Sequence, residues 1–334
     1  MGKVLCFGEL LLRISPDTEG EWIANNVMPV FVGGAELNVA TALAKWGVPV
    51  SYCTALPDNF LGGQLLQNLQ KKNIDVSSVI ITGNRVGVYY LPQGTDVKNA
   101  GVIYDRENSS FSQLKKKDFD WDKILEGITW FHFSAICPSI NQQVADICEE
   151  ALKACVKKNI SISVDLNYRS KLWQYGKQPN EIMPGLVKYC HVIMGNLWAA
   201  ESLLGIKSAI KESTGKTNNE LKTAAGQSML QLHRQYPQAS CIAYTFRLQN
   251  KYWAMVQHDK ELAISPQHQI NEVVDKVGSG DSFMAGLIYG LYHQHSLQQV
   301  ADVAAAAAFQ KLFIKADSIN KTIEEIKVFA KNHE

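Results

Sequence analysis

The chain has 334 residues, of which 46% are hydrophobic and 19% are charged, a composition typical of globular proteins. This length suffices for two domains or for one large α/β unit with a sizeable core. The 33 basic and 32 acidic residues give a formal net charge of +1. Neither the composition nor the charge indicates nucleic acid or an anionic membrane as a partner.

No segment of the sequence indicates secretion or a membrane anchor. The seven cysteines form an odd number without a C-x-x-C pair, which favours reduced, buried thiols over disulfides. The N-terminal stretch MGKVLCFGELLLRI contains an acid, Glu9, and no cleavage site of small residues. No apolar run reaches the ~18 residues of a membrane span, so we expect a cytoplasmic protein.

In chain order, the first part alternates between strand and helix patterns. A buried strand opens the chain and ends in a turn at Gly8 and Glu9. The residues AELNVATALAKWG, 35–47, have helical spacing and stop at a glycine, a common helix end. A strand at 48–56, a helix at 58–73 and a strand at 76–82 follow. This β–α–β–α order predicts a parallel, doubly wound sheet.

Two segments, 13–32 and 85–106, interrupt this order. The second, RVGVYYLPQGTDVKNAGVIYDR, has the pattern of two strands joined by a turn rich in Gly, Asp and Asn. Short strands inserted into an α/β core predict a small, discontinuous β-sheet that covers the core as a lid. The α/β core then comprises residues 1–12, 33–84 and 107–334.

From residue 130 onward the alternation returns. Strand patterns occupy 130–136, 160–168, 190–196, 240–246 and 251–257, and helix patterns occupy 141–159, 221–237 and a segment beginning at 200. A strand-like run at 270–277 leads into a glycine-rich loop and two helices, the second rich in alanine. The predicted fold class is α/β, a doubly wound, mostly parallel sheet flanked by helices, with one lid rather than two tandem domains.

The most informative stretch is VGSGDSF, in which Gly278, Ser279 and Gly280 precede an acid, Asp281, and an apolar helix pattern. Backbone N–H groups at such a helix start form an anion site. The loop is neither G-x-G-x-x-G, because Phe283 replaces the last glycine, nor a P-loop, because no lysine follows. A simple capped helix is the alternative interpretation.

An anion site beside a carboxylate matches phosphoryl transfer to an alcohol, which needs a base at the hydroxyl and donors around the phosphoryl oxygens. Asp281 is the predicted base, and the helix N-terminus is expected to keep it ionised at neutral pH. Gly278, Ser279 and Gly280 are the predicted donors. The eight histidines show no nucleophile–base arrangement, and His132 is predicted to be a core residue.

A second motif lies near the N-terminus, in FVGGAELN. Gly33 and Gly34 precede a helix and would let a substrate approach the backbone. Asn38 both donates and accepts hydrogen bonds, which suits the hydroxyls of a polyol. Taken alone, the motif is equally well explained as a turn before an ordinary helix.

Together, GGAELNVATALAKWG and DKVGSGDSFMAGL resemble the two signature regions of the ribokinase-like (PfkB) carbohydrate kinases. The resemblance extends over nearly the whole chain, including the opening FGELLLR, the hairpins of the lid and the alanine-rich helix. It implies a sugar kinase that uses ATP and Mg²⁺, with few protein ligands to the metal. Because lid sheets in this family often pair between subunits, it also implies a homodimer or a larger homo-oligomer.

Within this family, SVDLNYRSKLW and GVIYDRENSSFSQL are most similar to the 2-keto-3-deoxygluconate kinases. The resemblance implies that arginine and tyrosine side chains hold the carboxylate of a sugar acid. Forked arginines suit a carboxylate, although a surface ion pair is the alternative role for each. The implied substrate-binding residues are Gly33, Gly34, Asn38, Tyr89 or Tyr90, Tyr104, Arg106 and Arg169.

The sequence departs from the family pattern around the nucleotide. Lys276 stands where the second signature usually has threonine, and Ala199 takes the place of the glutamate in N-x-x-E, although Asn196 matches. A T-x-G-x-x-G turn is also missing, and Arg247 in that region is predicted to contact phosphate. The resemblance implies a nucleotide-binding set of Asn196, Arg247, Asp275, Gly278 and Gly280, and leaves open a K⁺ ion beside Asp275.

The sequence therefore leaves three alternative functions open. The first is ATP-dependent phosphorylation of the terminal primary hydroxyl of 2-keto-3-deoxy-D-gluconate. The second is the activity of another PfkB sugar kinase, such as a fructokinase or a 5-keto-2-deoxygluconate kinase. The third, suggested by Ala199 and Lys276, is a kinase fold that senses a sugar or a nucleotide without catalysis.

Overall fold

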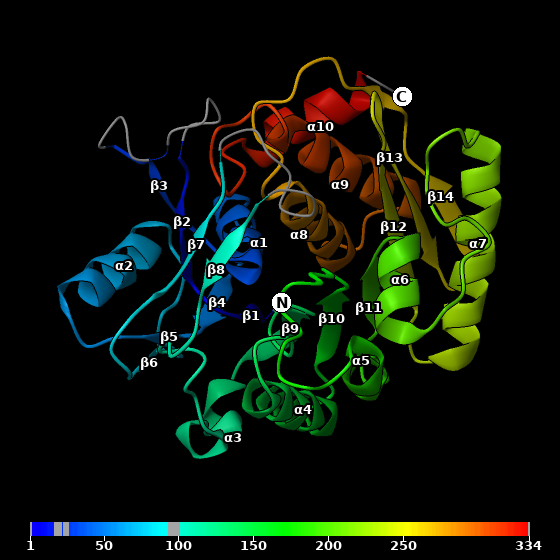
Figure 1. Ribbon diagram of the computed structural model, residues 1–334. Coiled ribbons are helices and arrows are strands. Elements are labelled where there is room, and N and C mark those ends of the chain that lie inside the picture. The colour runs from blue at the N-terminus through cyan, green and yellow to red at the C-terminus, as the bar shows by residue number, and fades with distance from the viewer. Residues whose placement is uncertain (1, 17–21, 23–26, 93–100, 333–334) are drawn as a thin grey trace.

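The structure is a computed structural model that describes residues 2–16, 22, 27–92 and 101–332. Its centre is a nine-stranded sheet with the strand order β14-β13-β12-β11-β10-β9-β1-β4, and β15 pairs with β13 (Figure 1). The strands are β1 (Lys3–Phe7), β4 (Val50–Cys53), β9 (Ile128–Ser134), β10 (Ser161–Asp165), β11 (Val192–Gly195), β12 (Cys241–Arg247), β13 (Lys251–His258), β14 (Glu261–Ile264) and β15 (His268–Gln269).

Six of these strands, from β12 to β4, run parallel, and β13, β14 and β15 pair antiparallel at one end of the sheet. The parallel strands are almost entirely buried, as expected where helices cover both faces. The mostly parallel α/β sheet predicted from the sequence is thus confirmed.

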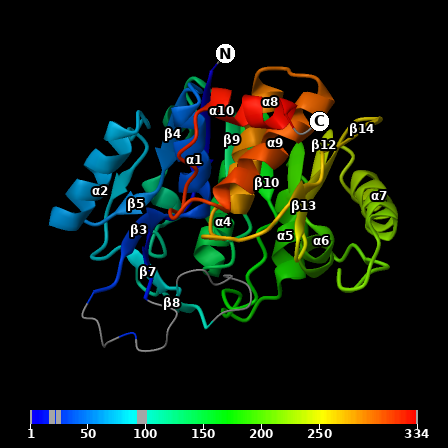
Figure 2. The ribbon, with the colours of Figure 1, turned by 90° about the horizontal axis from the view of Figure 1, so that it is seen from above.

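Helices cover both faces of the sheet, and each face has its own hydrophobic core (Figure 2). One core is built with α3 (Trp121–Ile124), α4 (Gln142–Lys157), α5 (Pro179–Val187), α6 (Leu197–Leu204) and α7 (Asn218–Gln235). The other is built with α1 (Ala35–Lys45), α2 (Phe60–Lys71), α8 (Ser279–Tyr292), α9 (Leu297–Lys311) and α10 (Ile323–Lys331). Gly286 lets α8 and α9 pack closely, because a Cβ there would stand 2.6 Å from the Cα of Ala304.

A separate four-stranded sheet with the order β3-β2-β7-β8 stands beside the carboxyl ends of the parallel strands (Figure 1). Its strands are β2 (Leu11–Ile14), β3 (Val30–Gly33), β7 (Gly87–Tyr90) and β8 (Ile103–Asp105). We call this sheet the lid. The turn predicted between its last two strands falls within 93–100, outside the described residues.

Two predicted strands differ in the structure. The segment 76–82 contributes only β6 (Ile80–Ile81), which pairs with β5 (Ala55–Leu56) outside the main sheet. The run 270–277 is irregular, since the N–H groups of Val274 and Asp275 both donate to the carbonyl oxygen of Leu312. The Asp275 side chain also accepts from the N–H of Val277 at 3.0 Å. A polar side chain that closes a local turn therefore overrides the apolar pattern.

The seven cysteines are all free and buried, which confirms the prediction of buried thiols. His132 is buried as well, as predicted, and burial lowers its pKa to about 3. Within the described part of the chain, none of the helices combines the length and the apolar character that a membrane crossing requires.

Candidate active site

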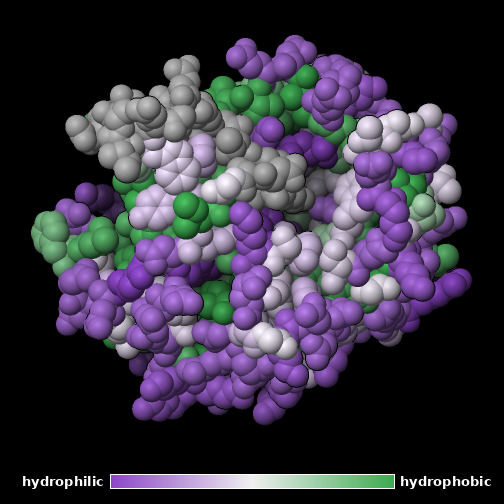
Figure 3. Space-filling view, viewed as in Figure 1, coloured by the Kyte–Doolittle hydropathy of each residue, from purple (hydrophilic) through white to green (hydrophobic). Residues whose placement is uncertain are grey.

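One cavity of about 780 Å³ lies between the carboxyl ends of the parallel strands, the lid and the N-terminus of α8. Ligand sites at this edge of a sheet are the rule in open α/β folds. Glu9 after β1, Asp165 at the end of β10, Asn196 after β11 and Arg247 at the end of β12 all line it. The space-filling view shows a hollow near the middle of this face, beside purple and near-white residues (Figure 3).

The glycine-rich loop opens α8 at the wall of this cavity. Gly278 has a left-handed backbone with φ 77°, and a Cβ there would stand 1.7 Å from the carbonyl oxygen of Asp317. Gly278, Ser279 and Gly280 line the cavity, and the first N–H groups of a helix have no partner within it. The hydroxyl of Ser279 donates to the carbonyl oxygen of Ala308 at 2.9 Å, so the cavity receives only the backbone of this residue. The loop has the features of an anion site.

Asp281 lies in the first turn of α8 without capping it, because no side chain caps this helix. Its Oδ2 accepts a hydrogen bond from the Nδ2 of Asn38 at 2.7 Å, and both residues line the cavity. The Oδ1 of Asn38 is buried without a hydrogen-bond partner among the described residues. The carboxylate and this amide oxygen are therefore placed to accept hydrogen bonds from the same ligand.

Burial raises the pKa of Asp281 to about 7, while the hydrogen bond from Asn38 and the charge of Arg169 act to lower it. Desolvation thus opposes the helix N-terminus, which was expected to keep Asp281 ionised, and leaves the carboxyl group partly ionised at neutral pH. A pKa near the working pH suits a general base.

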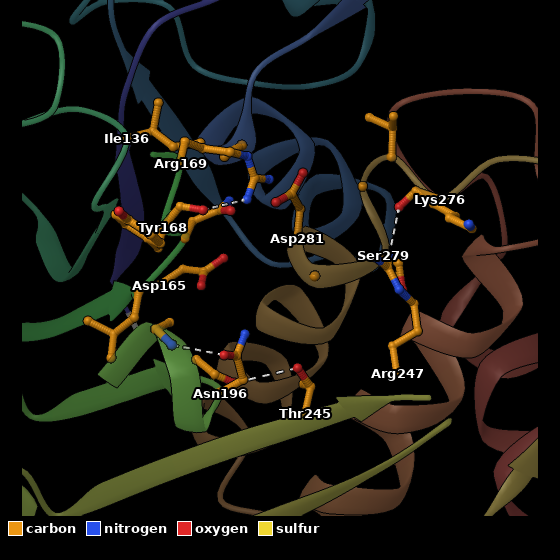
Figure 4. Close-up of a pocket in the computed structure, with 18 of the residues that line it drawn as sticks. Ile136, Asp165, Tyr168, Arg169, Asn196, Thr245, Arg247, Lys276, Ser279 and Asp281 are labelled. Atoms are coloured by element: carbon orange, nitrogen blue, oxygen red, sulfur yellow. Dashed lines mark hydrogen bonds between the residues drawn. The ribbon is translucent and has the colours of Figure 1, made fainter. Parts of the chain in front are cut away.

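Arg169 reaches the cavity from the loop after β10 and faces Asp281 across it (Figure 4). Its Nη1 donates to the carbonyl oxygen of Tyr168 at 3.1 Å, which fixes the direction of the half-buried side chain. The figure also shows Asp165 and Asn196 on the neighbouring strand ends, with Arg247 and Lys276 on the opposite side. The cavity thus has one cation, Arg169, beside Asp281 and two others, Arg247 and Lys276, on its opposite side.

Arg106 lines the cavity as a buried residue that is paired with an acid. Its Nε donates to the Oε2 of Glu9 at 2.6 Å, and its Nη2 lies 2.6 Å from the same oxygen. The Ser109 hydroxyl holds the other oxygen of Glu9 at 2.5 Å. Burial acts to lower the pKa of Arg106, but Glu9 raises it above the usual value. Arg106 therefore remains charged, and its orientation is set by Glu9.

Of the two candidate tyrosines, Tyr89 lines the cavity together with Tyr104, whereas Tyr90 does not. Successive residues of a strand face opposite sides, and Tyr90 stacks on Trp22 with ring centroids 6.4 Å apart. The structure also leaves Gly33 and Asp275 outside the cavity lining.

Gly34 does line the cavity, but the structure explains in another way why this position is a glycine. Its φ is 138°, and a Cβ there would stand 2.3 Å from the carbonyl oxygen of Glu9. The glycine is therefore required by the approach of the chain to itself.

On the nucleotide side, Asn196 caps α6, because its Oδ1 accepts from the N–H groups of Trp198 and Ala199 at 3.1 and 2.9 Å. Arg247 donates from Nη1 to the carbonyl oxygen of Lys276 at 3.5 Å. Glu201 points away from the cavity and pairs with Lys211 at the surface. Glu201 therefore does not replace the glutamate that the family places at position 199.

Sequence reasoning did not single out Glu9, Glu36 and Asp165, three buried acids of the cavity lining. Glu36 accepts from the N–H and hydroxyl of Ser134 at 2.9 and 2.5 Å, and burial raises its pKa. A usable signal existed for Glu9, because it follows a buried strand that was predicted to be parallel, where ligand sites gather. Asp165 lay inside the predicted strand 160–168, which in the structure already ends at this residue.

Known proteins match this chain over nearly its whole length. Residues 1–313 match a family model described as pfkB family carbohydrate kinase. The crystal structure of 2-dehydro-3-deoxygluconokinase from Thermotoga maritima is 34% identical, with a TM-score of 0.89 over 99% of this chain and 100% of that chain. A 2-dehydro-3-deoxygalactonokinase of Haloferax volcanii is 25% identical over 97% of this chain and 95% of its own length. A 2-dehydro-3-deoxygluconokinase of Bacillus subtilis is 26% identical over 85% and 82%.

Proposed function

Since this chain belongs to the pfkB family of carbohydrate kinases, we propose that it transfers the γ-phosphoryl group of ATP to the terminal primary hydroxyl of a sugar acid. The first candidate is 2-keto-3-deoxy-D-gluconate, also called 2-dehydro-3-deoxygluconate, which would yield its 6-phosphate. One observation supports a sugar acid as the substrate. Arg106 and Arg169 line the same cavity as Tyr89, Tyr104 and Asp281. Both Thermotoga and Bacillus relatives are named for this substrate.

In the proposed reaction, the hydroxyl oxygen of the sugar forms a bond to the γ-phosphorus as the bond to the bridging oxygen of ADP breaks. Asp281 accepts the hydroxyl proton, and Asn38 holds the carboxylate in place through the 2.7 Å hydrogen bond. The N–H groups of Gly278, Ser279 and Gly280 stabilise the charge on the transferring group. A weak base suffices when it mainly orients the hydroxyl.

The cavity fits Mg²⁺ bound mainly through nucleotide phosphates and water, which is how kinase sites commonly hold it. Among the described residues, no three His, Cys, Asp or Glu side chains form a metal-binding group. The cavity lining has five basic and four acidic side chains, so an anionic nucleotide is not repelled overall. Arg247, Lys276 and Asn196 would lie on the nucleotide side, and the metal would shield the phosphate charge.

We further propose a cytoplasmic homo-oligomer that pairs through the lid. The seven buried free thiols suit a reducing compartment. The outer strands of the lid, β3 and β8, expose Val30 and Ile103 by 57% and 52%, and apolar outer strands favour pairing with another sheet. Light scattering that gives the 37.1 kDa mass of one chain would contradict this proposal.

The test of the substrate is a coupled ADP-release assay with 2-keto-3-deoxygluconate, its galactonate epimer, 5-keto-2-deoxygluconate and fructose. We expect the highest kcat/KM with one of the two 2-keto-3-deoxy acids. Equal or better turnover of fructose would contradict the sugar-acid assignment, and tight binding without any transfer would favour the sensing role.

The same assay with Arg169→Gln separates the acid from the neutral sugars. Loss of a charged hydrogen bond to a carboxylate costs about 1.5–3 kcal/mol, so KM for the acid should rise roughly 10- to 100-fold while KM for any neutral sugar stays nearly constant.

A K⁺-free assay tests whether a cation binds beside Asp275, where the Nη2 of Arg13 already stands 2.6 Å from Oδ2. We expect no loss of turnover in that assay.

A further inference from the structure

One row of side chains crosses the lid on the face that meets the core. The strand registers place Phe31 of β3 opposite Arg13 of β2, Arg13 opposite Tyr89 of β7, and Tyr89 opposite Tyr104 of β8. The two tyrosines of this row line the cavity. Arg13 occupies the middle of the row, and its guanidinium carbon stands 4.3 Å from the centroid of the Phe31 ring.

Arg13 is 1% exposed and is bound to two carboxylates that come from the far end of the chain. Its Nη2 lies 2.6 Å from the Oδ2 of Asp275 and 2.7 Å from the Oδ1 of Asp317, and its Nε donates to the same oxygen of Asp317 at 2.8 Å. Tyr89 donates its hydroxyl to the other oxygen of Asp317 at 3.1 Å. Two strands of the lid are thus joined to the core by side chains that are shielded from water.

Both carboxylates belong to the support of the glycine-rich loop. Asp275 accepts from the N–H of Val277 at 3.0 Å, which shapes the turn that leads into Gly278. The carbonyl oxygen of Asp317 packs against Gly278 so closely that a Cβ would stand 1.7 Å from it. The guanidinium of Arg13 therefore contacts the two residues that define where the loop begins.

The buried Lys311 is a second basic side chain in this group of two acids. The Nζ of Lys311 donates to the carbonyl oxygen of Ile314 at 3.0 Å, and Asp275 and Asp317 both act to raise its pKa, although burial lowers it to about 8. A buried ion network of this kind adds little net stability over apolar packing, but the loss of one member is costly. We therefore expect this ion network to fix the relative positions of the lid and the glycine-rich loop rather than to add stability.

We propose that Arg13 is a positioning residue: from the centre of the lid it holds Asp275 and Asp317, and through them keeps the Gly278–Ser279–Gly280 loop in register with the sugar-binding face of the lid. This inference rests on the proposed phosphoryl-binding role of that loop. The N–H groups of the loop, which would bind the phosphoryl group, and the sugar contacts of the lid are then connected through Arg13 and its two carboxylates. Arg13 itself contacts neither substrate.

The test is Arg13→Lys, which keeps the charge but loses the fork that bridges two carboxylates. Since a misplacement of ~1 Å can cost about 10²-fold in rate, we expect kcat to fall roughly 10- to 100-fold while ATP binding, measured with a non-hydrolysable analogue, changes little. Arg85→Lys is the matched control. Arg85 also belongs to the lid segment and pairs with Asp105 at 2.7 Å, but at 38% and 45% exposure, where ion pairs contribute little.

A purely structural role would lower the melting temperature and the folded fraction without changing kcat per folded molecule. Arg13→Ala with added guanidinium ion, far below denaturing concentrations, separates the two, because a positioning role predicts partial recovery of kcat. Equal kcat for Arg13→Lys and Arg85→Lys, or no recovery in the alanine variant, would overturn the inference. Each variant is assayed on whichever sugar the wild type phosphorylates, so a failed substrate assignment leaves this test intact.

Discussion

Asp281→Asn is expected to lower kcat by about 10²–10⁴-fold, the usual contribution of a positioned general base. The amide has the shape of the carboxyl group, and its oxygen can accept the hydrogen bond that the Nδ2 of Asn38 donates to Asp281 at 2.7 Å. The variant should therefore still bind ATP and sugar. The measurement is kcat and KM by coupled ADP release, together with calorimetric titration of both substrates.

The pH dependence gives this prediction a second readout. With the pKa of Asp281 at about 7 in the folded protein, the basic form is lost as the pH falls, so kcat/KM of the wild type should drop tenfold per pH unit below about 7. Residual activity of Asp281→Asn should lack this limb. A flat wild-type profile between pH 5.5 and 8.5 would contradict a base role for Asp281.

The stability of the same variant has a sign that follows from the pKa. The folded pKa lies above the usual value of a free aspartate, so the folded state binds this proton more tightly, and stability is lost as the pH rises from about 4 through about 7. Asp281→Asn should be at least as stable as the wild type at pH 8.5, with a smaller difference at pH 5. Lower stability at both pH values would indicate that lost activity reflects misfolding.

Ser279→Ala is the matched control for the loop, because the Ser279 hydroxyl donates to the carbonyl oxygen of Ala308, away from the cavity. We expect kcat within a few-fold of the wild type and a stability loss of about 1 kcal/mol. A loss of turnover as large as that of Asp281→Asn would show that the side chain, rather than the backbone, serves the reaction.

The sequence predicted the parts of this molecule whose signals are local. The glycines, the acid and the start of α8 are neighbours in the chain, so VGSGDSF predicted a helix N-terminus beside a carboxylate without knowledge of the fold. The alternation of strands and helices likewise predicted the parallel sheet, and the resemblance to the PfkB kinases, based on two motifs, is confirmed by the family match over residues 1–313.

The partners of buried charges were not predictable, because nothing local encodes them. Arg13 contacts Asp275 and Asp317 across 262 and 304 residues of sequence, and Arg106 contacts Glu9 across 97. Any of these residues alone has the pattern of a surface charge. Only the tertiary fold brings them together, and the burial that raises the pKa of Asp281 is likewise not encoded by its position on the helix.

The prediction of a strand at 270–277 was wrong for a different reason. Its apolar residues fit a buried strand as well as a buried loop, since periodicity alone does not distinguish the two. The deciding feature is Asp275, whose side chain closes a turn with the N–H of Val277 at 3.0 Å. Acids placed just before a glycine-rich loop deserve a turn prediction even inside an apolar run.

The glycines of the loop are expected to be indispensable for two different reasons. Gly278→Ala forces an alanine into a backbone with φ 77° and places its Cβ 1.7 Å from the carbonyl oxygen of Asp317. The left-handed backbone alone costs about 1–2 kcal/mol, and the clash requires the loop or the 317 region to move. We expect a clear fall in melting temperature together with loss of turnover.

Gly280→Ala should leave the fold intact, because a Cβ there meets nothing within 4 Å and alanine favours a helix over glycine by about 1 kcal/mol. Gly280 lines the cavity within the first turn of α8, so the added methyl group would stand where the proposed function places the phosphoryl group. We expect unchanged or higher stability with kcat/KM for ATP lowered at least about tenfold, since small displacements of reacting groups are costly. Thermal melts and steady-state kinetics measure both quantities.

Gly226→Ala on α7 separates the helix effect from the site effect, because this glycine also has open space around its missing Cβ but lies outside the cavity lining. It should gain stability and keep full activity. If Gly280→Ala behaves like Gly226→Ala, no phosphoryl group comes close to that backbone, and the anion site must lie elsewhere in the cavity. If Gly280→Ala instead loses activity at unchanged stability, the space in front of Gly280 is needed by the substrate, and the loop serves the reaction through its backbone.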